Sequence, residues 1–297
     1  MVSRKIFLII CLLIINTSMA YAQTLNVGPE QAYSTIQSAI DAAKNGDTIL
    51  VGEGTYYENP LIKTNGISIT GKNKEKTIIE GRNTSSGIRI DGVNNVIISG
   101  FTVRNSRGGA QEAAGVTIYD GKDNTVSNMN IFSNKVGISL YQQSNNNIIS
   151  GNDIESNDRD GIFIYASNDN RIFNNNIKNN KIYGINAYSS KANLIYSNNM
   201  IENKDQAYDN SGLNSWYLDN KGNYWSDNTG SDEYIITPGG KNVKDNFPLK
   251  SALSIRSESV PTQQVQKDNG ETKSTPGFTV FISIISFVYI GIFRRRK

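Results

Sequence analysis

Gly115 to Asn203 decides the fold, because this stretch repeats nearly the same string four times: GVTIYDGKDNTVSNMNIFSN (115–134), GISLYQQSNNNIISGNDIESN (137–157), GIFIYASNDNRIFNNNIKNN (161–180) and GINAYSSKANLIYSNNMIEN (184–203). The leading glycines are 22, 24 and 23 residues apart, and a looser copy begins at Gly87. Self-similarity at a fixed period of this size is typical of a solenoid in which each copy forms one coil.

Each copy contains two short runs in which apolar and polar residues alternate. The first and third positions after the glycine are apolar, as in Ile138 and Leu140. A second apolar pair lies five residues apart, as in Ile149 and Ile154. This period predicts short strands that bury one face, and the Asn, Gly, Ser and Asp between them favour tight turns.

Stacked copies bury their apolar faces together, with like residues about 4.8 Å apart on neighbouring strands. We therefore predict an all-β fold, a single-stranded parallel β-helix (solenoid), right-handed because crossover connections nearly always are. A leucine-rich or helical repeat of similar period does not fit, because no apolar pattern recurs at i, i+3, i+4 and the Leu-rich consensus is absent.

The two ends of this body differ from the repeats. Residues 33–44 place apolar side chains on one helical face, with Ser34 as the expected N-cap, and predict a short N-terminal capping helix. The first strand of the body is expected at Asp47–Val51. The clear repeats occupy 87–203; residues 204–249 lose the period, contain both tryptophans, Trp216 and Trp225, and predict an aromatic C-terminal cap.

The remaining segments predict export. Residues 1–22 have a basic start, a short apolar run and a small-residue site, as in a signal peptide. We expect 23–249 to be the β-helix domain and 250–275 a flexible linker. Residues 276–297 combine an apolar run with four terminal basic residues and predict a membrane anchor. Asn83-Thr84-Ser85 is an N-glycosylation triplet.

Composition narrows the function. The two ends hold six of the 30 Lys and Arg and no acid, so the body has 24 basic against 27 acidic residues, which gives no case for nucleic acid. The chain has no His, and its one Cys lies in the signal. Copper selects imidazole and sulfur ligands, of which the body keeps Met129 and the core-facing Met200. A copper function is therefore not expected.

One position of the repeat is a candidate for ligand binding, because stacked coils would place its residues in a column on the outer surface. The fourth residue after each repeat glycine is a tyrosine and should face outward, because the first and third face inward. Such a stack suits sugar rings, and a purely structural stack is the alternative. The Asn runs at 145–147 and 174–176 are expected to form structural ladders. The ligand-binding candidates are Tyr119, Tyr141, Tyr165 and Tyr188.

A group of acids is a candidate catalytic site, and one lengthened coil is a candidate binding edge. Two carboxylates roughly 5–9 Å apart suit glycoside hydrolysis, although polar turns are also rich in acids. We expect five acids to lie around one corner beside Arg159 and Arg171, namely Asp153, Glu155, Asp158, Asp160 and Asp169. The insertion at 107–112 forms either a binding edge or a tolerated loop. The weak catalytic candidates are Asp153, Asp158, Asp160 and Asp169.

Several strings carry a resemblance to known families. The start of the body, with YSTIQ at 33–37 and GTYYE at 54–58, looks like pectate-lyase-like β-helix proteins. The repeats, with GNYWSD at 222–227 and DNFPL at 245–249, resemble the NosD-type surface proteins of archaea. That likeness spans 25–249 and indicates the fold, whereas the superfamily contains lyases, hydrolases, epimerases and non-catalytic surface proteins.

The same resemblances bear on cofactors and on the tail. The NosD-type cap usually holds a longer Asp- and Gly-rich loop; here it is cut short, and Asp227 and Asp232 are the weak calcium candidates that remain. No other cofactor is expected. The Pro-Gly-Phe string at 276–278 and the tail after it resemble the archaeal PGF-type C-terminal sorting signal, which implies cleavage and attachment to lipid. An uncleaved tail would be a plain membrane anchor.

We therefore predict a non-catalytic protein anchored at the outer face of the cell membrane, with a polysaccharide or an envelope component as its partner. A polysaccharide-active lyase, hydrolase or epimerase that uses the aspartates is the alternative.

Overall fold

The structure, a computed structural model, describes residues 22–111, 113–236 and 243–255. The chain divides into a unit of residues 1–260 and a second unit of 261–297. The predicted signal peptide, most of the linker and the C-terminal anchor lie outside the described residues. Within those residues, no helix combines the length and apolar character needed to cross a membrane.

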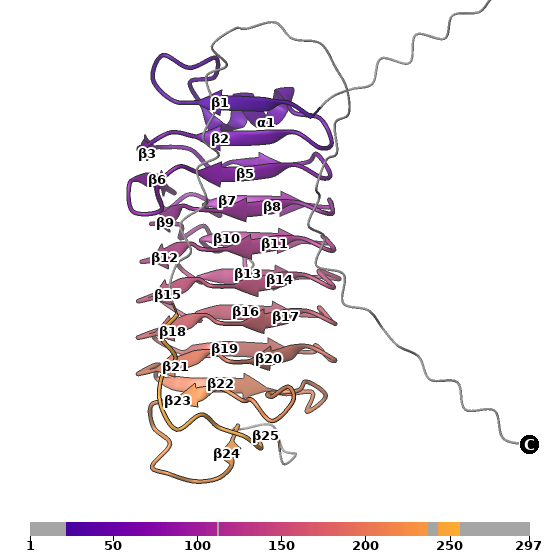
Figure 1. Cartoon of the computed structure of the whole chain (residues 1–297), viewed down its shortest axis with the longest axis vertical. Helices are drawn as coiled ribbons and strands as arrows, with labels where there is room; N and C mark the ends of the chain where they lie inside the picture. The colour runs from indigo at the N-terminus through magenta and orange to yellow at the C-terminus, as the bar shows by residue number, and fades with distance from the viewer. Residues whose placement is uncertain (1–21, 112, 237–242, 256–297) are drawn as a thin grey trace, which may run out of the picture. The chain divides into compact units, whose positions relative to one another are not determined.

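The body is a right-handed parallel β-helix of about nine coils, as predicted (Figure 1). Each complete coil contributes one short strand to each of three parallel sheets, named A, B and C, whereas the first coil gives only the first strand of sheet A and the last coil only the last strand of sheet B. In spatial order, sheet A contains β1 (Thr24–Val27), β2 (Thr48–Val51), β5 (Ser68–Gly71), β8 (Ile97–Ser99), β11 (Thr125–Ser127), β14 (Ile148–Ser150), β17 (Arg171–Phe173) and β20 (Leu194–Tyr196).

Sheets B and C complete the wall. Sheet B contains β3 (Gly54–Tyr56), β6 (Thr77–Glu80), β9 (Thr102–Arg104), β12 (Asn130–Phe132), β15 (Asp153–Glu155), β18 (Asn176–Lys178), β21 (Asn199–Ile201) and β23 (Tyr224–Trp225). Sheet C contains β4 (Leu61–Ile62), β7 (Ile88–Asp91), β10 (Val116–Tyr119), β13 (Ile138–Tyr141), β16 (Ile162–Tyr165), β19 (Tyr183–Tyr188) and β22 (Asp205–Asp209). An antiparallel pair, β24 (Tyr234–Ile235) and β25 (Lys244–Asp245), follows.

The register places like residues over like, so the core is a set of apolar columns. Ile138 of β13 pairs with Ile162 of β16, which pairs with Ile185 of β19. All three are fully buried, as are the Ile149 and Ile154 columns. The inward columns predicted from the repeat are therefore confirmed, and they supply the apolar burial that stabilises a fold with so little helix.

Buried asparagines line the corners between sheets and hydrogen-bond from coil to coil. Asn157 Oδ1 accepts from the backbone amide of Asn134 at 3.0 Å, and Asn157 Nδ2 donates to Asn180 Oδ1 at 2.9 Å. The predicted ladders are confirmed for Asn147 and Asn175. By contrast, the middle of the run 145–147, Asn146, adopts a left-handed backbone that turns the chain.

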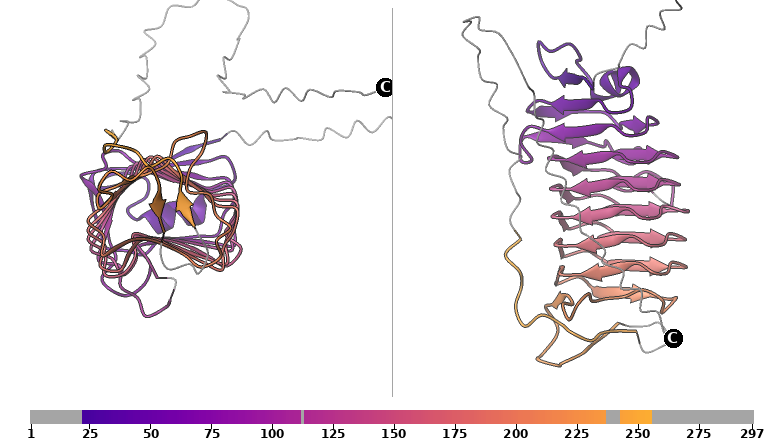
Figure 2. Two further views of the ribbon diagram at one scale, coloured as in Figure 1. Left: turned by 90° about the horizontal axis from the view of Figure 1, so that it is seen from below. Right: turned by 45° about the vertical axis from the view of Figure 1, so that its right-hand side comes forward.

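The N-terminal cap differs from the prediction in two details. Helix α1 (Ile36–Ala42) is capped by Thr35, not Ser34, because the Thr35 hydroxyl accepts from the Ser38 amide at 3.2 Å. The helix buries its apolar face against the end of the core (Figure 2). The first strand is β1, which precedes α1 and pairs with β2. Its alternation is too short for sequence analysis to detect.

The aromatic C-terminal cap is confirmed. Trp216 and Trp225 are buried, with ring centroids 5.9 Å apart. Trp225 Nε1 donates to the buried Asp245 Oδ2 at 2.9 Å, so each polar edge of this plug has a partner.

Candidate ligand-binding site

The four predicted tyrosines form a continuous stack on the outer face of sheet C. They are paired in register from β10 to β19, as the repeat predicts. The ring centroids are 6.0 Å apart for Tyr119 and Tyr141, 4.7 Å for Tyr141 and Tyr165, and 6.0 Å for Tyr165 and Tyr188. Interplanar angles of 12–20° make these offset stacks.

This geometry limits what the stack can offer a ligand. Because neighbouring rings cover one another, the inner tyrosines present edges and hydroxyl groups more than faces. At one end, the Arg89 guanidinium lies 4.5 Å from the Tyr119 ring centroid. At the other end, Tyr188 is 44% exposed, and β22 ends at Asp209 opposite Ala187, so no aromatic residue follows in the column. Tyr188 is therefore the ring most accessible to a ligand.

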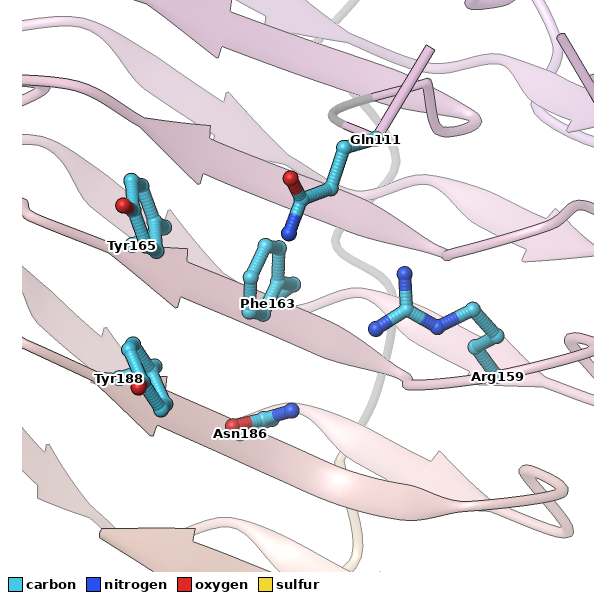
Figure 3. A pocket seen from close by; sticks show the side chains of 6 residues that line it. All are labelled: Gln111, Arg159, Phe163, Tyr165, Asn186 and Tyr188. Atoms are coloured by element: carbon cyan, nitrogen blue, oxygen red, sulfur yellow. The ribbon is translucent and has the colours of Figure 1, made fainter. Parts of the chain in front are cut away.

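A groove of about 360 Å³ lies beside the Tyr188 end of the stack (Figure 3). Its floor includes Phe163 of β16 and Asn186 of β19, which each stand two residues after a repeat glycine and pair directly. The Arg159 guanidinium points toward Phe163 from the corner before β16. The lining residues are Gln111, Arg159, Phe163, Tyr165, Asn186 and Tyr188.

The lengthened coil supplies one wall of this groove. Its loop projects from the wall of the solenoid (Figure 2, left), and Gln111 of this loop lines the groove (Figure 3). Lys135 Nζ donates to the Ala110 carbonyl at 2.8 Å, and Arg107 pairs with Asp158 through Nε and Oδ2. Ala114 packs with Phe163 in a small apolar cluster. Charged and apolar contacts thus hold the loop against the wall.

Asp160 lies beneath the groove and is fully buried. Burial raises its pKa and outweighs the opposing effects of the Arg159 charge, the Asn186 hydrogen bond and the Tyr183 amide. Arg159 Nη2 lies 3.6 Å from Asp160 Oδ2, and Asn186 Nδ2 donates to the same oxygen at 3.2 Å. Within the described residues, Asp160 Oδ1 and Asn186 Oδ1 are buried without a hydrogen-bond partner.

The other three aspartates do not join Asp160 in the groove. Asp158 faces the loop side of the corner: burial alone would raise its pKa, but Lys181 and Arg107 outweigh burial and lower it. Asp153 lies in sheet B, 3.1 Å from the buried Lys74 Nζ. Asp169 is exposed in the turn between sheets C and A. Asp158 and Asp160 thus share one corner, whereas the expectation is wrong for Asp153 and Asp169, because a coil carries nearby residues to different sides.

The structure gives metal ions little to bind. No group of three or more His, Cys, Asp or Glu side chains that could hold an ion exists among the described residues. Asp227 accepts from the Tyr234 hydroxyl at 3.0 Å, and Asp232 lies 3.2 Å from Lys250 Nζ; both aspartates are exposed. Met129 and Met200 are fully buried in the core. These residues do not fit a copper site.

Sequence analysis missed the groove. Phe163 and Asn186 belong to an outward column of sheet C in which no residue type recurs, so no repetition draws attention to it. Other members of this column include Arg89, Thr117, Ser139 and Tyr208. Two features of the sequence could have revealed the groove. One is the insertion at 107–112, and the other is Phe163, a large aromatic residue at an outward position two coils after the insertion.

A family model described as "Periplasmic copper-binding protein (NosD)" matches residues 30–230. The cell surface glycoprotein of Methanothermus fervidus is 32% identical over 132 residues, which cover 42% of this chain and 21% of that protein. The uncharacterized protein YwoF of Bacillus subtilis is 31% identical over 101 residues, 30% of this chain and 22% of that protein. The alignments thus span about a fifth of either relative.

Solved β-helix structures are also similar. The periplasmic alginate epimerase AlgG superposes with a TM-score of 0.45 at 18% identity, over 70% of this chain and 45% of that chain. Pectin methylesterase from carrot gives a TM-score of 0.47 at 15% identity, over 63% of this chain and 65% of that chain. Likenesses at this level do not indicate a shared activity.

Proposed function

The chain belongs to the NosD family, and on this β-helix scaffold we propose a non-catalytic cell-surface protein that binds polysaccharide at the groove beside Tyr188. A surface location agrees with the family's periplasmic description and with the name of the Methanothermus relative. That description also names copper binding, but this chain has no His and its Met129 and Met200 are buried. We therefore place the function at the groove and not at a copper site.

The convergence of aromatic and polar groups in the groove carries this proposal. Tyr188 supplies exposed apolar ring surface, and Phe163 lies in the floor of the groove with 4% of its surface exposed. Asn186, Gln111 and Arg159 supply hydrogen-bonding groups beside these rings. A sugar ring needs this combination, because its C–H face packs on aromatic rings and its hydroxyl groups require donors and acceptors. The straight stack of coils also suits an extended polymer, since sheet C continues past both ends of the groove.

A glycan array probed with the full-length protein tests this function. Tyr188→Ala should weaken retention about tenfold or more, because it removes the most accessible ring of the groove. Tyr119→Ala is the matched control: it stands in the same column, outside the groove, beneath Arg89. Wild-type protein that retains no glycan, or a Tyr188→Ala variant that binds as well as wild type, would contradict the proposal.

One observation favours the enzymatic alternative. Asp160 is a buried acid with a raised pKa next to an arginine, and such groups act as proton donors in many enzymes. However, the described residues that line the groove include no carboxylate, and Asp160 lies buried beneath it, whereas glycoside hydrolysis uses a pair of carboxylates. Incubation with the glycans that the array retains, followed by product analysis, decides the matter: turnover that Asp160→Asn abolishes would establish an enzyme.

A further inference from the structure

We propose that the groove is selective for acidic glycans, with the Arg159 guanidinium binding the carboxylate of a uronic acid residue while Tyr188 supports its ring. The inference rests on the proposed function and adds the chemical class of the ligand.

Arg159 is placed to receive an anion. Its guanidinium points into the groove over Phe163, 5.6 Å from the ring centroid, and its side chain is 31% exposed. Its ion pair within the described residues, to Asp160, is 3.6 Å long and thus longer than a charge-assisted hydrogen bond. A guanidinium has five N–H donors in a planar fork that matches a carboxylate, so donors remain for a ligand.

The surrounding charges favour an anion as well. Arg107, Lys135 and Lys181 lie at the same corner as Arg159, held by contacts to the loop and to Asp158. Of the acids beside these four cations, Asp158 pairs with Arg107 and Lys181, and Asp160 lies 3.6 Å from Arg159. The groove is therefore locally basic on a body that is mildly acidic as a whole, and this field would attract acidic polymers.

A buried acceptor lies at the inner end of the site. Asn186 is 8% exposed, lines the groove and leaves Oδ1 without a partner among the described residues. A buried polar atom without a hydrogen bond is costly, and sugar hydroxyl groups are donors that would satisfy such acceptors. A uronic acid residue could donate a hydroxyl group to Asn186 Oδ1 at the inner end of the groove and place its carboxylate at the Arg159 guanidinium.

The experiment compares two forms of one polymer. Binding of hexagalacturonate and of its fully methyl-esterified form to the full-length protein is measured by calorimetry, because esterification removes the charge and keeps the sugar rings. We expect the free acid to bind about tenfold or more tightly, with an advantage that shrinks as salt is added. Hexamannuronate, in acid and ester forms, repeats the comparison with another stereochemistry.

Arg159→Gln should remove the preference for the acid and leave binding of the ester within about twofold of wild type. Arg159→Lys keeps the charge without the fork and should retain part of the preference. Arg171→Gln is the matched control, because Arg171 lies over Phe173 at 5.7 Å on sheet A, away from the groove, and this variant should bind both forms like wild type.

The outcomes separate the two proposals. If acid and ester bind equally and Tyr188→Ala weakens both, the selectivity is overturned while glycan binding stands. If Arg171→Gln loses the acid preference as fully as Arg159→Gln, the preference reflects overall charge and the assigned residue is wrong. If Tyr188→Ala leaves binding of both forms unchanged, the groove is not the site and both proposals fail.

Discussion

Asp158 and Asp160 lie two residues apart at one corner, and the fold shifts their pKa values in opposite directions. Hydrogen bonds and charges from Lys181 and Arg107 prevail at Asp158, whereas burial prevails at Asp160. The pair therefore predicts two opposite dependences of stability on pH.

Asp158→Asn should destabilise the body by about 1 kcal/mol at pH 7, because it removes ion pairs to Arg107 and Lys181. A lowered pKa stabilises the folded state above the unfolded value and loses that contribution as pH falls through the folded value. The difference between variant and wild type should thus shrink as pH falls below about 4. Urea denaturation at pH 7 and pH 3 measures it; an equal difference at both pH values would refute the assignment.

Asp160→Asn should show the reverse trend. A raised pKa means that the folded state favours the neutral acid, so the wild type loses stability as pH rises through the folded value. The neutral amide avoids this loss, and the variant should gain on wild type between pH 4 and pH 8. Urea denaturation across this range measures the effect. Parallel pH curves for the two proteins would show that Asp160 does not titrate as described.

Asn157→Ala should destabilise the body by about 3 kcal/mol, since it deprives the Asn134 amide and Asn180 Oδ1 of buried hydrogen bonds. Asn168→Ala is the control, because Asn168 also accepts from the next coil, at the Lys191 amide, but is half-exposed and leaves groups that water reaches. Its cost should stay below about 1 kcal/mol. If thermal or urea unfolding shows that both variants lose the same stability, the buried asparagine ladder stabilises the fold no more than an exposed hydrogen bond does.

The fold and its inward columns could be predicted because the repeat states them four times. Ile138, Ile162 and Ile185 recur at one position, and a recurring position in a solenoid is a column in space. The outward register of the tyrosines follows from the same pattern. The repeat does not predict which tyrosine ring faces are accessible to a ligand, because stacking of the rings between coils decides this.

The groove could not be read from the repeat for physical reasons. Phe163 and Asn186 differ in type, so no periodicity marks them, and Gln111 reaches the wall only because Lys135 and the Arg107 pair fix the loop. Proximity in sequence was misleading for the acids: Asp153 and Asp160 are seven residues apart, yet one lies on sheet B and the other beneath the outer face of sheet C.

The repeat glycines are required by close packing and not by backbone conformation. A Cβ at Gly161 would lie 2.6 Å from the Gly184 carbonyl oxygen and 2.6 Å from Ile177 Cγ2. Gly161→Ala should therefore cost about 3 kcal/mol or more. Gly92→Ala is the control: Gly92 has a φ of +66° but open space around it, so alanine should cost about 1 kcal/mol. A larger loss at Gly92, measured by urea denaturation, would reverse this interpretation.

Copper should leave the protein unaffected, in contrast to the description of its family. A ligand that binds the native state raises the melting temperature according to its concentration and Kd. This chain has no His, Met129 and Met200 are buried in the core, and Cys11 lies in the predicted signal peptide. Neither Cu(I) nor Cu(II) in tenfold excess should therefore shift the Tm of the protein that lacks residues 1–22. A copper-dependent rise in Tm would reopen the metal function.

A double variant, Tyr141→His with Tyr165→His, is the positive control for this measurement. The two rings stack 4.7 Å apart on adjacent strands, so the substitutions place two imidazoles side by side at the surface. Imidazole is a preferred copper ligand, and two on neighbouring strands should bind Cu(II) and raise the Tm with added metal. A shift in this variant and none in the wild type would show that the fold accepts copper once ligands are supplied, and that the natural sequence does not supply them.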